Sequence, residues 1–507
     1  MIKANPVKSI FFKNPKLKQA LVVALVFLVS ESILFFFHEV WRDELQSWAL
    51  TLNSHSLSEL FFNTRYEGHP KLWYMILFAL QKFTDNVLYM RLLHLIIASS
   101  TVFVFCFYSP LSLSKNILFC FGYFFAYEYS IISRNYAIEM LLLFLSMGIY
   151  LKNPQRSIIP VSILIFLILQ ANAFAVILGL SFFGYIFLSM KRSELLKRKS
   201  MIAGCIVLTG LAVFLVTTVP PAGAGFINGW DTRPSLSHLL RVGSNIFRSY
   251  FPFPRLIPQF WDTNFTDTVS NSIIPQACLA VLILAVCTVI FYKNKKVLLF
   301  FYAGTLGILV FTYTKYIGYM RHHGHFYILF ILCCWLYFSN EKKLKRTDSI
   351  RGLPDYFITF VLVIQISSTC IAAFYDIKFP FSNAEAAEKF IRDNAYDKMI
   401  IAGDADAPVS SIACLMNKNF YYCNGQRWGT GLVWDTGRKE IPDTTFFTET
   451  IKLADYFKSD FLLVLSYRPA YKPASWYFLK NFEGAMVGDE NYFIYLVKYL
   501  KPVKIKL

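Results

Sequence analysis

Three short clusters of ionisable residues interrupt a chain that is otherwise strongly apolar. They are Trp41-Arg42-Asp43-Glu44, Arg65-Tyr66-Glu67-Gly68-His69-Pro70 and Arg321-His322-His323-Gly324-His325. Carboxylates and imidazoles can move protons, guanidinium groups can hold anions, and histidines can bind metal ions. Each cluster also has a plain structural explanation, because an acidic pair can cap a helix and histidines around a glycine can form a solvated loop or a pH-sensitive patch. The elements that position the clusters decide between these roles.

Composition predicts that those elements are membrane helices. Hydrophobic residues make up 56% of the 507 residues, charged residues only 16%, and the mean hydropathy is +0.45. Runs such as 88–108, 272–292 and 355–375 are long enough to cross a hydrocarbon layer about 30 Å thick. We therefore predict a polytopic α-helical membrane protein with about eleven transmembrane helices. The net charge of +18 lies in short basic loops, which indicates contact with membrane lipids and no nucleic-acid partner.

The basic loops also predict which side of the membrane each segment faces. Loops rich in Lys and Arg are expected in the cytoplasm, namely 191–199, 293–296 and 342–346. The segment 219–271 and the cluster Arg321–His325 lie between these loops, so both should be outside. The last span, at about 355–375, then carries the remainder of the chain to the outside as well.

The two N-terminal clusters are predicted to share that outer face. A first helix at 20–37 follows a basic stretch and precedes no cleavage site, so we interpret it as retained, with its N-terminus inside. Residues 38–87 then form a long outer loop lying on the membrane. Spans at 116–131 and 135–151 place Arg134 near the outer surface. Ionisable groups at a membrane boundary are costly unless they are paired or functional, so their co-location favours a functional site.

The chain is expected to form two domains. Residues 1–375 are the transmembrane domain, with outer loops 38–87 and 219–271, and residues 376–507 are a small soluble α/β domain on the extracytoplasmic side. Its short strand-like segments are Met399–Ala402, Phe461–Leu465 and Tyr492–Val497. Cys414 and Cys423 lie in this region, and the sequence leaves open whether they form a disulfide.

The clusters also resemble a known family. An acidic pair directly after the first membrane helix, Asp43-Glu44, precedes a His69-Pro70-Lys71-Leu72 element in the same outer loop, with Arg91 and Arg134 further along. This arrangement resembles the membrane glycosyltransferases of the GT-C superfamily, nearest to the protein O-mannosyltransferase and aminoarabinose transferase type and to an uncharacterised bacterial branch. The motif-bearing part covers roughly 20–150. Those relatives usually carry a second proline where this chain has Lys71.

The resemblance implies transfer of a sugar from a polyprenyl-phosphate donor, with inversion, to a lipid, glycan or protein acceptor at the outer face of the bacterial inner (plasma) membrane. Asp43 and Glu44 are the expected catalytic residues, with Asp43 as general base. The expected substrate-binding residues are Glu67, His69, Arg134, Arg321 and His322. Within this set Arg321 is the first candidate for the leaving phosphate, and a divalent metal ion (Mg or Mn) is an alternative source of positive charge. The outer loop 219–271 would close over the sugar with Trp230 and Trp261.

Other functions are compatible with the same residues. A flippase or transporter of a lipid-linked sugar would use similar charges, but should carry some at mid-membrane and show repeat symmetry. The helices look nearly uncharged at their centres and no repeat is visible, so the enzyme is favoured. A polysaccharide polymerase or ligase would differ mainly in a diphosphate-linked donor, and a catalytically inactive scaffold is a further alternative. The sugar, the acceptor, the metal dependence and the oligomeric state do not follow from the sequence.

Overall fold

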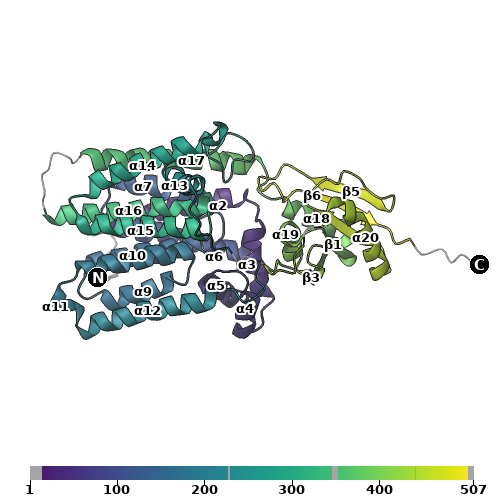
Figure 1. The fold of residues 1–507 in the computed structure, drawn as a ribbon, viewed down its shortest axis with the longest axis horizontal. Helices are drawn as coiled ribbons and strands as arrows, with labels where there is room; N and C mark the ends of the chain where they lie inside the picture. The colour runs from purple at the N-terminus through teal and green to yellow at the C-terminus, as the bar shows by residue number, and fades with distance from the viewer. Residues whose placement is uncertain (1–13, 226–228, 345–351, 440, 501–507) are drawn as a thin grey trace, which may run out of the picture.

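The protein has a helical body with a smaller sheet-containing part at one end (Figure 1). The computed structural model describes residues 14–225, 229–344, 352–439 and 441–500. Within them, six helices are long and apolar enough to cross a membrane. They are α2 (Pro15–Phe35), α6 (Leu88–Tyr108), α12 (Arg198–Thr218), α14 (Ile273–Phe291), α15 (Lys295–Thr314) and α17 (Gly352–Lys378). The chain is therefore a helical membrane protein, as its composition predicts.

The expected number of about eleven spans is not reached by these six helices. Several apolar runs form helices that are too short, namely α8 (Tyr136–Lys152), α9 (Ile158–Ile168) and α10 (Ala173–Ser189). The run at 116–131, predicted to be one span, breaks into α7 (Leu113–Cys120) and a π-helical turn, η1 (Phe124–Glu128). Hydropathy counts an apolar run without detecting such breaks or the shortness of a helix, and this accounts for part of the excess.

Helix α16 (Met320–Leu344) runs through the middle of the body. Every residue from Phe326 to Leu336 is buried, because α10, α13 and α15 pack around the helix. Gly324 lets α16 approach η1 closely, since a Cβ at this position would overlap the Tyr129 hydroxyl and the Phe124 ring. The Tyr129 hydroxyl donates instead to the Arg321 carbonyl at 2.7 Å. The glycine therefore sets the position of the third ionisable cluster.

Both predicted outer loops contain helices. Residues 38–87 form α3 (Arg42–Leu52), α4 (Leu57–Asn63) and α5 (Leu72–Leu80). The segment 219–271 contains α13 (Leu236–Tyr250) and a short 3₁₀ turn, η2 (Phe265–Thr268). One face of α13 packs into the body against α14 and α16, burying Ile246, Phe247 and Tyr250. Much of this segment is thus part of the helical body and not a free loop. A one-turn helix, α11 (Arg192–Leu195), precedes α12.

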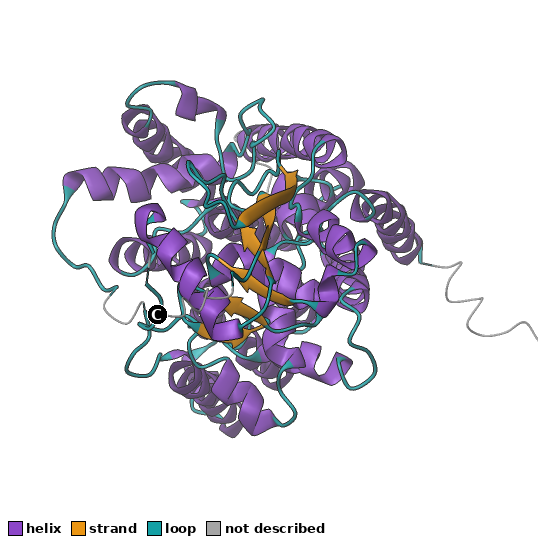
Figure 2. Ribbon diagram, turned by 90° about the vertical axis from the view of Figure 1, so that its right-hand side faces the viewer, coloured by secondary structure: helices purple, strands orange, loops and turns teal. Residues whose placement is uncertain are grey.

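The C-terminal part contains one six-stranded mixed sheet with the strand order β3-β2-β1-β4-β6-β5. The strands are β1 (Ile400–Gly403), β2 (Phe420–Tyr422), β3 (Arg427–Gly429), β4 (Phe461–Leu465), β5 (Trp476–Phe482) and β6 (Tyr492–Val497). The helices are α18 (Ala384–Asp393), η3 (Tyr396–Lys398), α19 (Asp406–Met416) and α20 (Asp443–Phe457). Strand β4 is buried at all five residues, as its unbroken apolar run requires of a central strand. The three predicted strands are confirmed as β1, β4 and β6, and Figure 2 shows the sheet flanked by helices.

Helix α19 packs against α3, and this contact joins the sheet-containing part to the helical body. Cys414 is buried there, and its thiol donates to the Leu45 carbonyl at 3.5 Å. Cys414 and Cys423 are both free and buried, so the structure contains no disulfide between them.

Candidate functional site

Asp43 lies between two arginines that come from distant parts of the chain. It is the second residue of α3, whose N-cap residue is Trp41. Its Oδ2 atom is 2.9 Å from Nη2 of Arg321, in the first turn of α16, and 3.4 Å from Nη1 of Arg134, just before α8. Arg134 also donates to the Asp43 carbonyl. The structure thus brings together one member of the first cluster, one of the third, and Arg134.

The two arginines determine the charge state of Asp43. Burial alone would raise the pKa of this carboxyl, but Arg134 and Arg321, with Arg42 behind them, hold the pKa below its ordinary value of 3.8. Asp43 is therefore ionised at neutral pH. Two guanidinium groups share its single negative charge, so this group of three carries a net positive charge.

Aromatic rings surround the Arg321 guanidinium. Its central carbon is 5.4 Å from the ring centroids of both Trp41 and Trp261, and 5.0 Å from that of Tyr319. Such contacts between a cation and ring faces stabilise a desolvated guanidinium and restrict its rotation. Trp261, from the predicted sugar-covering loop, thus reaches this site. Trp230 is 64% exposed, and it lies instead beside Lys315, so its predicted place in the site is not observed.

Glu67 and His69, from the second cluster, lie next to this group. Glu67 accepts a hydrogen bond from Gln46 at 2.9 Å and one from the Tyr74 hydroxyl at 3.4 Å. Burial raises the pKa of Glu67 to about 7, although the Gln46 hydrogen bond opposes this shift. Burial, followed by the charges of Arg134 and Lys71, lowers the pKa of His69 to about 3. At neutral pH, His69 is therefore an uncharged imidazole and Glu67 is poised between its two protonation states.

Lys71, the position that departs from the resembling family, holds this segment together. Its ammonium group donates to the Thr64 carbonyl at 2.8 Å, and the side chain is 5% exposed. Burial lowers the pKa of Lys71 to about 8, while Glu67 acts in the opposite direction. The lysine thus closes a turn around Glu67 and His69 by a hydrogen bond.

Glu44 points into the protein. Its Oε1 atom accepts from the Ser133 N–H at 2.6 Å, and its Oε2 atom lies 3.3 Å from the Trp41 N–H and 3.4 Å from Nε2 of His38. The residue has no exposed surface. Although burial would raise its pKa, the His38 and Ser133 hydrogen bonds keep the pKa below 4.5. This geometry suits a residue that positions the start of α3, and the predicted catalytic role of Glu44 stays a prediction.

The histidines of the third cluster do not converge. His322 accepts from the Tyr319 N–H through Nδ1 at 2.9 Å, His323 bonds the Ile317 carbonyl, and His325 pairs with the buried Glu139 at 3.1 Å. Among the residues with described positions, no three His, Cys, Asp or Glu side chains are grouped as ligands for a metal ion. The divalent ion that the resemblance offers as an alternative source of positive charge stays a prediction.

The sequence did not predict several residues that connect α3 to the C-terminal part. The Gln46 side chain donates to the Leu432 carbonyl at 2.7 Å and accepts from the Leu432 N–H at 2.9 Å, so it connects α3 to the C-terminal part. The Arg42 N–H donates to Glu490 at 2.9 Å, and its guanidinium pairs with Asp489. Isolated polar residues such as Gln46 carry no spacing signal that would single them out.

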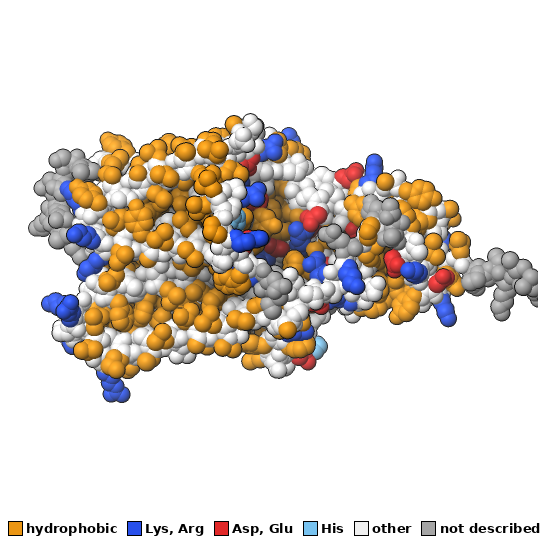
Figure 3. Space-filling model, viewed as in Figure 1, with side chains coloured by type: hydrophobic (Ala, Val, Ile, Leu, Met, Phe, Trp, Pro, Cys, Tyr) orange, Lys and Arg blue, Asp and Glu red, His pale blue; other side chains and the backbone are white. Residues whose placement is uncertain are grey.

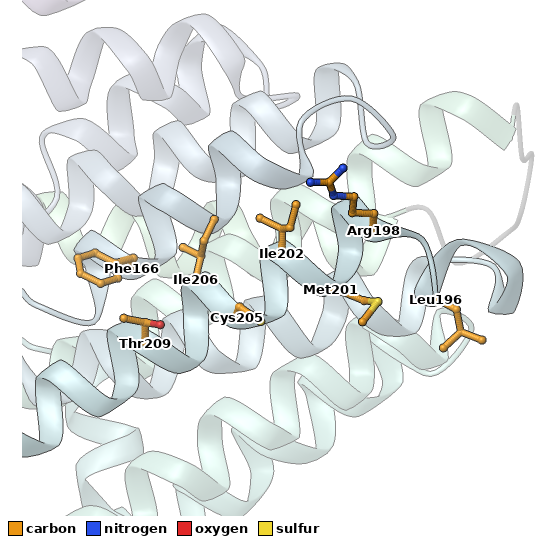
Figure 4. A pocket seen from close by; sticks show the side chains of 8 residues that line it. All are labelled: Phe166, Leu196, Arg198, Met201, Ile202, Cys205, Ile206 and Thr209. Carbon is orange, nitrogen blue, oxygen red and sulfur yellow. The ribbon is translucent and has the colours of Figure 1, made fainter.

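The site lies where the helical body meets the C-terminal part, and Figure 3 shows a hollow there in which side chains of both charges are visible. A cavity of about 650 Å³ lies elsewhere, along α12 (Figure 4). Its lining is mainly apolar, with Phe166, Met201 and Ile206 among the contributors, and it contains no member of the ionisable clusters. Compared with known proteins, the chain matches no family model and no curated protein.

Proposed function

We propose that this chain is a membrane glycosyltransferase of the GT-C type, which transfers a sugar from a polyprenyl-phosphate donor to an acceptor at the extracytoplasmic face. The single observation that carries the proposal is the sharing of the Asp43 carboxylate by Arg134 and Arg321 at one end of the helical body. This arrangement supplies a base and an anion-binding pair within one hydrogen-bonded group.

The two guanidinium groups suit the leaving group. A sugar phosphodiester carries one negative charge, and the polyprenyl phosphate that departs carries a second one. Arginine donors already held in place, Arg321 by its ring contacts and Arg134 by the Asp43 carbonyl, favour the state with the larger charge. They therefore bind the departing phosphate more strongly than the intact donor, and this difference lowers the barrier.

In the proposed reaction, the bond between the anomeric carbon and the phosphate oxygen breaks while the acceptor nucleophile bonds to that carbon from the opposite side. The acceptor proton passes to Asp43. The low pKa of Asp43 comes from its arginine partners, so it rises as the negative charge of the phosphate offsets the positive charge of Arg134 and Arg321. Glu67 orients the acceptor by accepting a hydrogen bond, and neutral His69 supplies a further polar contact.

The distribution of basic residues supports the extracytoplasmic location. Lys and Arg side chains line the end of the helical body farthest from the C-terminal part (Figure 3). Positively charged loops remain in the cytoplasm when a membrane protein inserts. The opposite end, with Asp43 and the C-terminal sheet, would then face outward from the bacterial inner membrane.

Asp43→Asn tests the proposal directly. In membranes supplied with defined polyprenyl-phosphate sugars, we expect the variant to transfer sugar at least about a hundredfold more slowly, because a general base is removed. Asp85→Asn, an exposed residue of the same N-terminal segment, is the matched control and should transfer at the wild-type rate. Undiminished transfer by Asp43→Asn would remove the proposed base. Passage of the sugar lipid across the bilayer without any product would support a transporter instead.

The pH dependence of transfer should report Glu67. Because burial places its pKa at about 7, we expect the rate to rise as the pH increases from 6 to 8 and Glu67 becomes able to accept a hydrogen bond from the acceptor. Glu67→Gln cannot titrate, so its rate should be lower at pH 8 and should change little across this interval. The measurement is the transfer rate at saturating donor. A variant profile that still rises like that of the wild type would assign the ionisation to another group.

A further inference from the structure

A second cavity, of about 480 Å³, lies away from Asp43 at the ends of three candidate membrane helices. Helix α2 ends at Phe35, α6 begins at Leu88, and α17 ends at Lys378. All three of these terminal residues line the cavity, together with Phe36, Phe37, His38, Glu39, Arg91, Asp376, Ile377, Phe379, Pro380 and Glu385. The cavity therefore sits where the apolar helices give way to polar surroundings.

Side chains of both charges line this cavity. Glu39, Asp376 and Glu385 supply carboxyl groups, and Arg91 and Lys378 supply two permanent cations. His38 is protonated as well, because Asp376 and Glu44 raise its pKa to about 9 against the opposing effect of burial, but these two carboxylates already pair with it. An occupant with one net charge would pair with only one of the two sets of side chains, whereas a zwitterion can pair with both.

Some of these groups lack partners. Asp376 is 1% exposed and uses Oδ2 to accept from His38 at 2.9 Å, but its Oδ1 makes no hydrogen bond of normal geometry to any described residue, although the Tyr127 hydroxyl lies near it. Oε2 of Glu39 and Nε of Arg91 are likewise buried and unpartnered within the described chain. Buried polar atoms normally find a partner, so these atoms are available to hydrogen-bond an occupant of the cavity.

Apolar side chains beside the cavity remain exposed. Phe36 is 82% exposed, and Phe37 and Ile377 are each nearly half exposed. At the end of a membrane helix, such side chains contact lipid chains or the interface. A molecule that fills the cavity can therefore extend an apolar tail over this surface, which a free metabolite cannot do.

We propose that this cavity holds the headgroup of a zwitterionic phospholipid with a primary ammonium group, such as phosphatidylethanolamine. The ammonium donates to the carboxylates of Glu39, Glu385 and Asp376, and the phosphate accepts from Arg91 and Lys378. One acyl chain then lies over Phe36 and Ile377. This inference is independent of the proposed glycosyl transfer.

The same contacts predict which phospholipid binds most tightly in this cavity. Phosphatidylglycerol offers the phosphate but no cation, so the carboxylates stay unpaired. Phosphatidylcholine offers a cation without N–H donors, so it cannot hydrogen-bond those carboxylates. Charged hydrogen bonds contribute about 1.5–3 kcal/mol each, which corresponds to at least about tenfold in affinity for phosphatidylethanolamine over either lipid.

Native mass spectrometry of the detergent-purified full chain, titrated with each of the three lipids, tests the proposal. We expect phosphatidylethanolamine to bind at least about tenfold more tightly than the other two, and the double variant Glu39→Gln/Glu385→Gln to lose this preference. Asp393→Asn, on the exposed far end of α18, is the matched control and should keep it. Equal binding of all three lipids, or an unchanged preference in the double variant, would overturn the proposal.

Glycerophosphoethanolamine, which has the headgroup without acyl chains, separates a lipid from a soluble zwitterion. We expect it to bind at least about a hundredfold more weakly, since acyl burial contributes about 0.8 kcal/mol per methylene. Binding as tight as that of the lipid would overturn the lipid assignment. Thermal unfolding of the double variant without added lipid shows whether the variant is folded. A melting temperature close to that of the wild type means that a lost lipid preference is not caused by unfolding.

Discussion

Replacing Arg321 by alanine should lower the rate of sugar transfer about a thousandfold, the largest catalytic effect that we expect from a single substitution. The guanidinium is 2.9 Å from Asp43 and is held among Trp41, Trp261 and Tyr319, so it cannot be replaced by a neighbouring side chain. Its removal takes away a positive charge that binds the departing phosphate more strongly than it binds the intact donor. The reduction should therefore appear in kcat more than in KM.

Two further variants separate the charge of Arg321 from its geometry and provide a control. Arg321→Lys retains a charge but presents a compact ammonium in place of a planar fork, so we expect it to recover only part of the rate. Arg241→Ala removes an exposed arginine from α13 and should leave transfer unchanged. If Arg321→Ala transferred sugar within about threefold of the wild type, the arginine pair could not be the phosphate site.

His38→Gln should reduce the free energy of unfolding by about 3–5 kcal/mol, the largest stability effect that we expect. His38 donates to Asp376 at 2.9 Å and lies 3.4 Å from Glu44, and none of these three side chains is exposed. Glutamine keeps the approximate shape but not the charge, so it leaves two buried carboxylates uncompensated. Thermal or denaturant unfolding in detergent measures the change, and His55→Gln, an exposed histidine of the same segment, is the control.

The destabilisation should depend on pH in a defined direction. The pKa of His38 is about 9 in the folded protein, against an ordinary value of 6.5. Its protonated form therefore contributes its full stabilisation below pH 6.5, and the contribution is lost as the pH rises through 9, for a total of about 3 kcal/mol. The difference in stability between the wild type and His38→Gln should shrink over this interval. A difference that stayed constant from pH 6 to 9 would mean that His38 acts by shape and not by charge.

The sequence predicted that charged residues from distant segments lie close together, and it predicted more membrane helices than the structure has. The basic loops assign Asp43, Arg134 and Arg321 to one face, and in the structure these three side chains are in contact. The number of membrane helices was overestimated, because hydropathy does not register that an apolar run is broken, as at α7 and η1, or is only 11 residues long, as in α9. Burial against other helices and burial in lipid produce the same apolar signal.

The positioning contacts could not be predicted for a different reason. His38 and Asp376 are 338 positions apart, and Gln46 and Leu432 are 386 positions apart. No periodicity joins such pairs, since each depends on how the last membrane helix and the C-terminal sheet dock on α3. The strands of that sheet were easier, because β4 and β6 are locally apolar runs of the length expected for a strand.

Residues near the end of the chain hold α3 in place, and this has a consequence for how the protein is synthesised. Arg42 meets its partner Glu490 across 448 positions, so at about 5–20 residues per second the ribosome needs roughly 20–90 seconds to supply that partner after α3 has emerged. For most of that interval the nascent chain has its acidic pair but lacks Arg321. It lacks the contact with Glu490 until the end of the interval. A chain that ends before Asp489 lacks the two contacts of Arg42, and one that ends before α19 also lacks the contacts of α19 and Leu432 with α3.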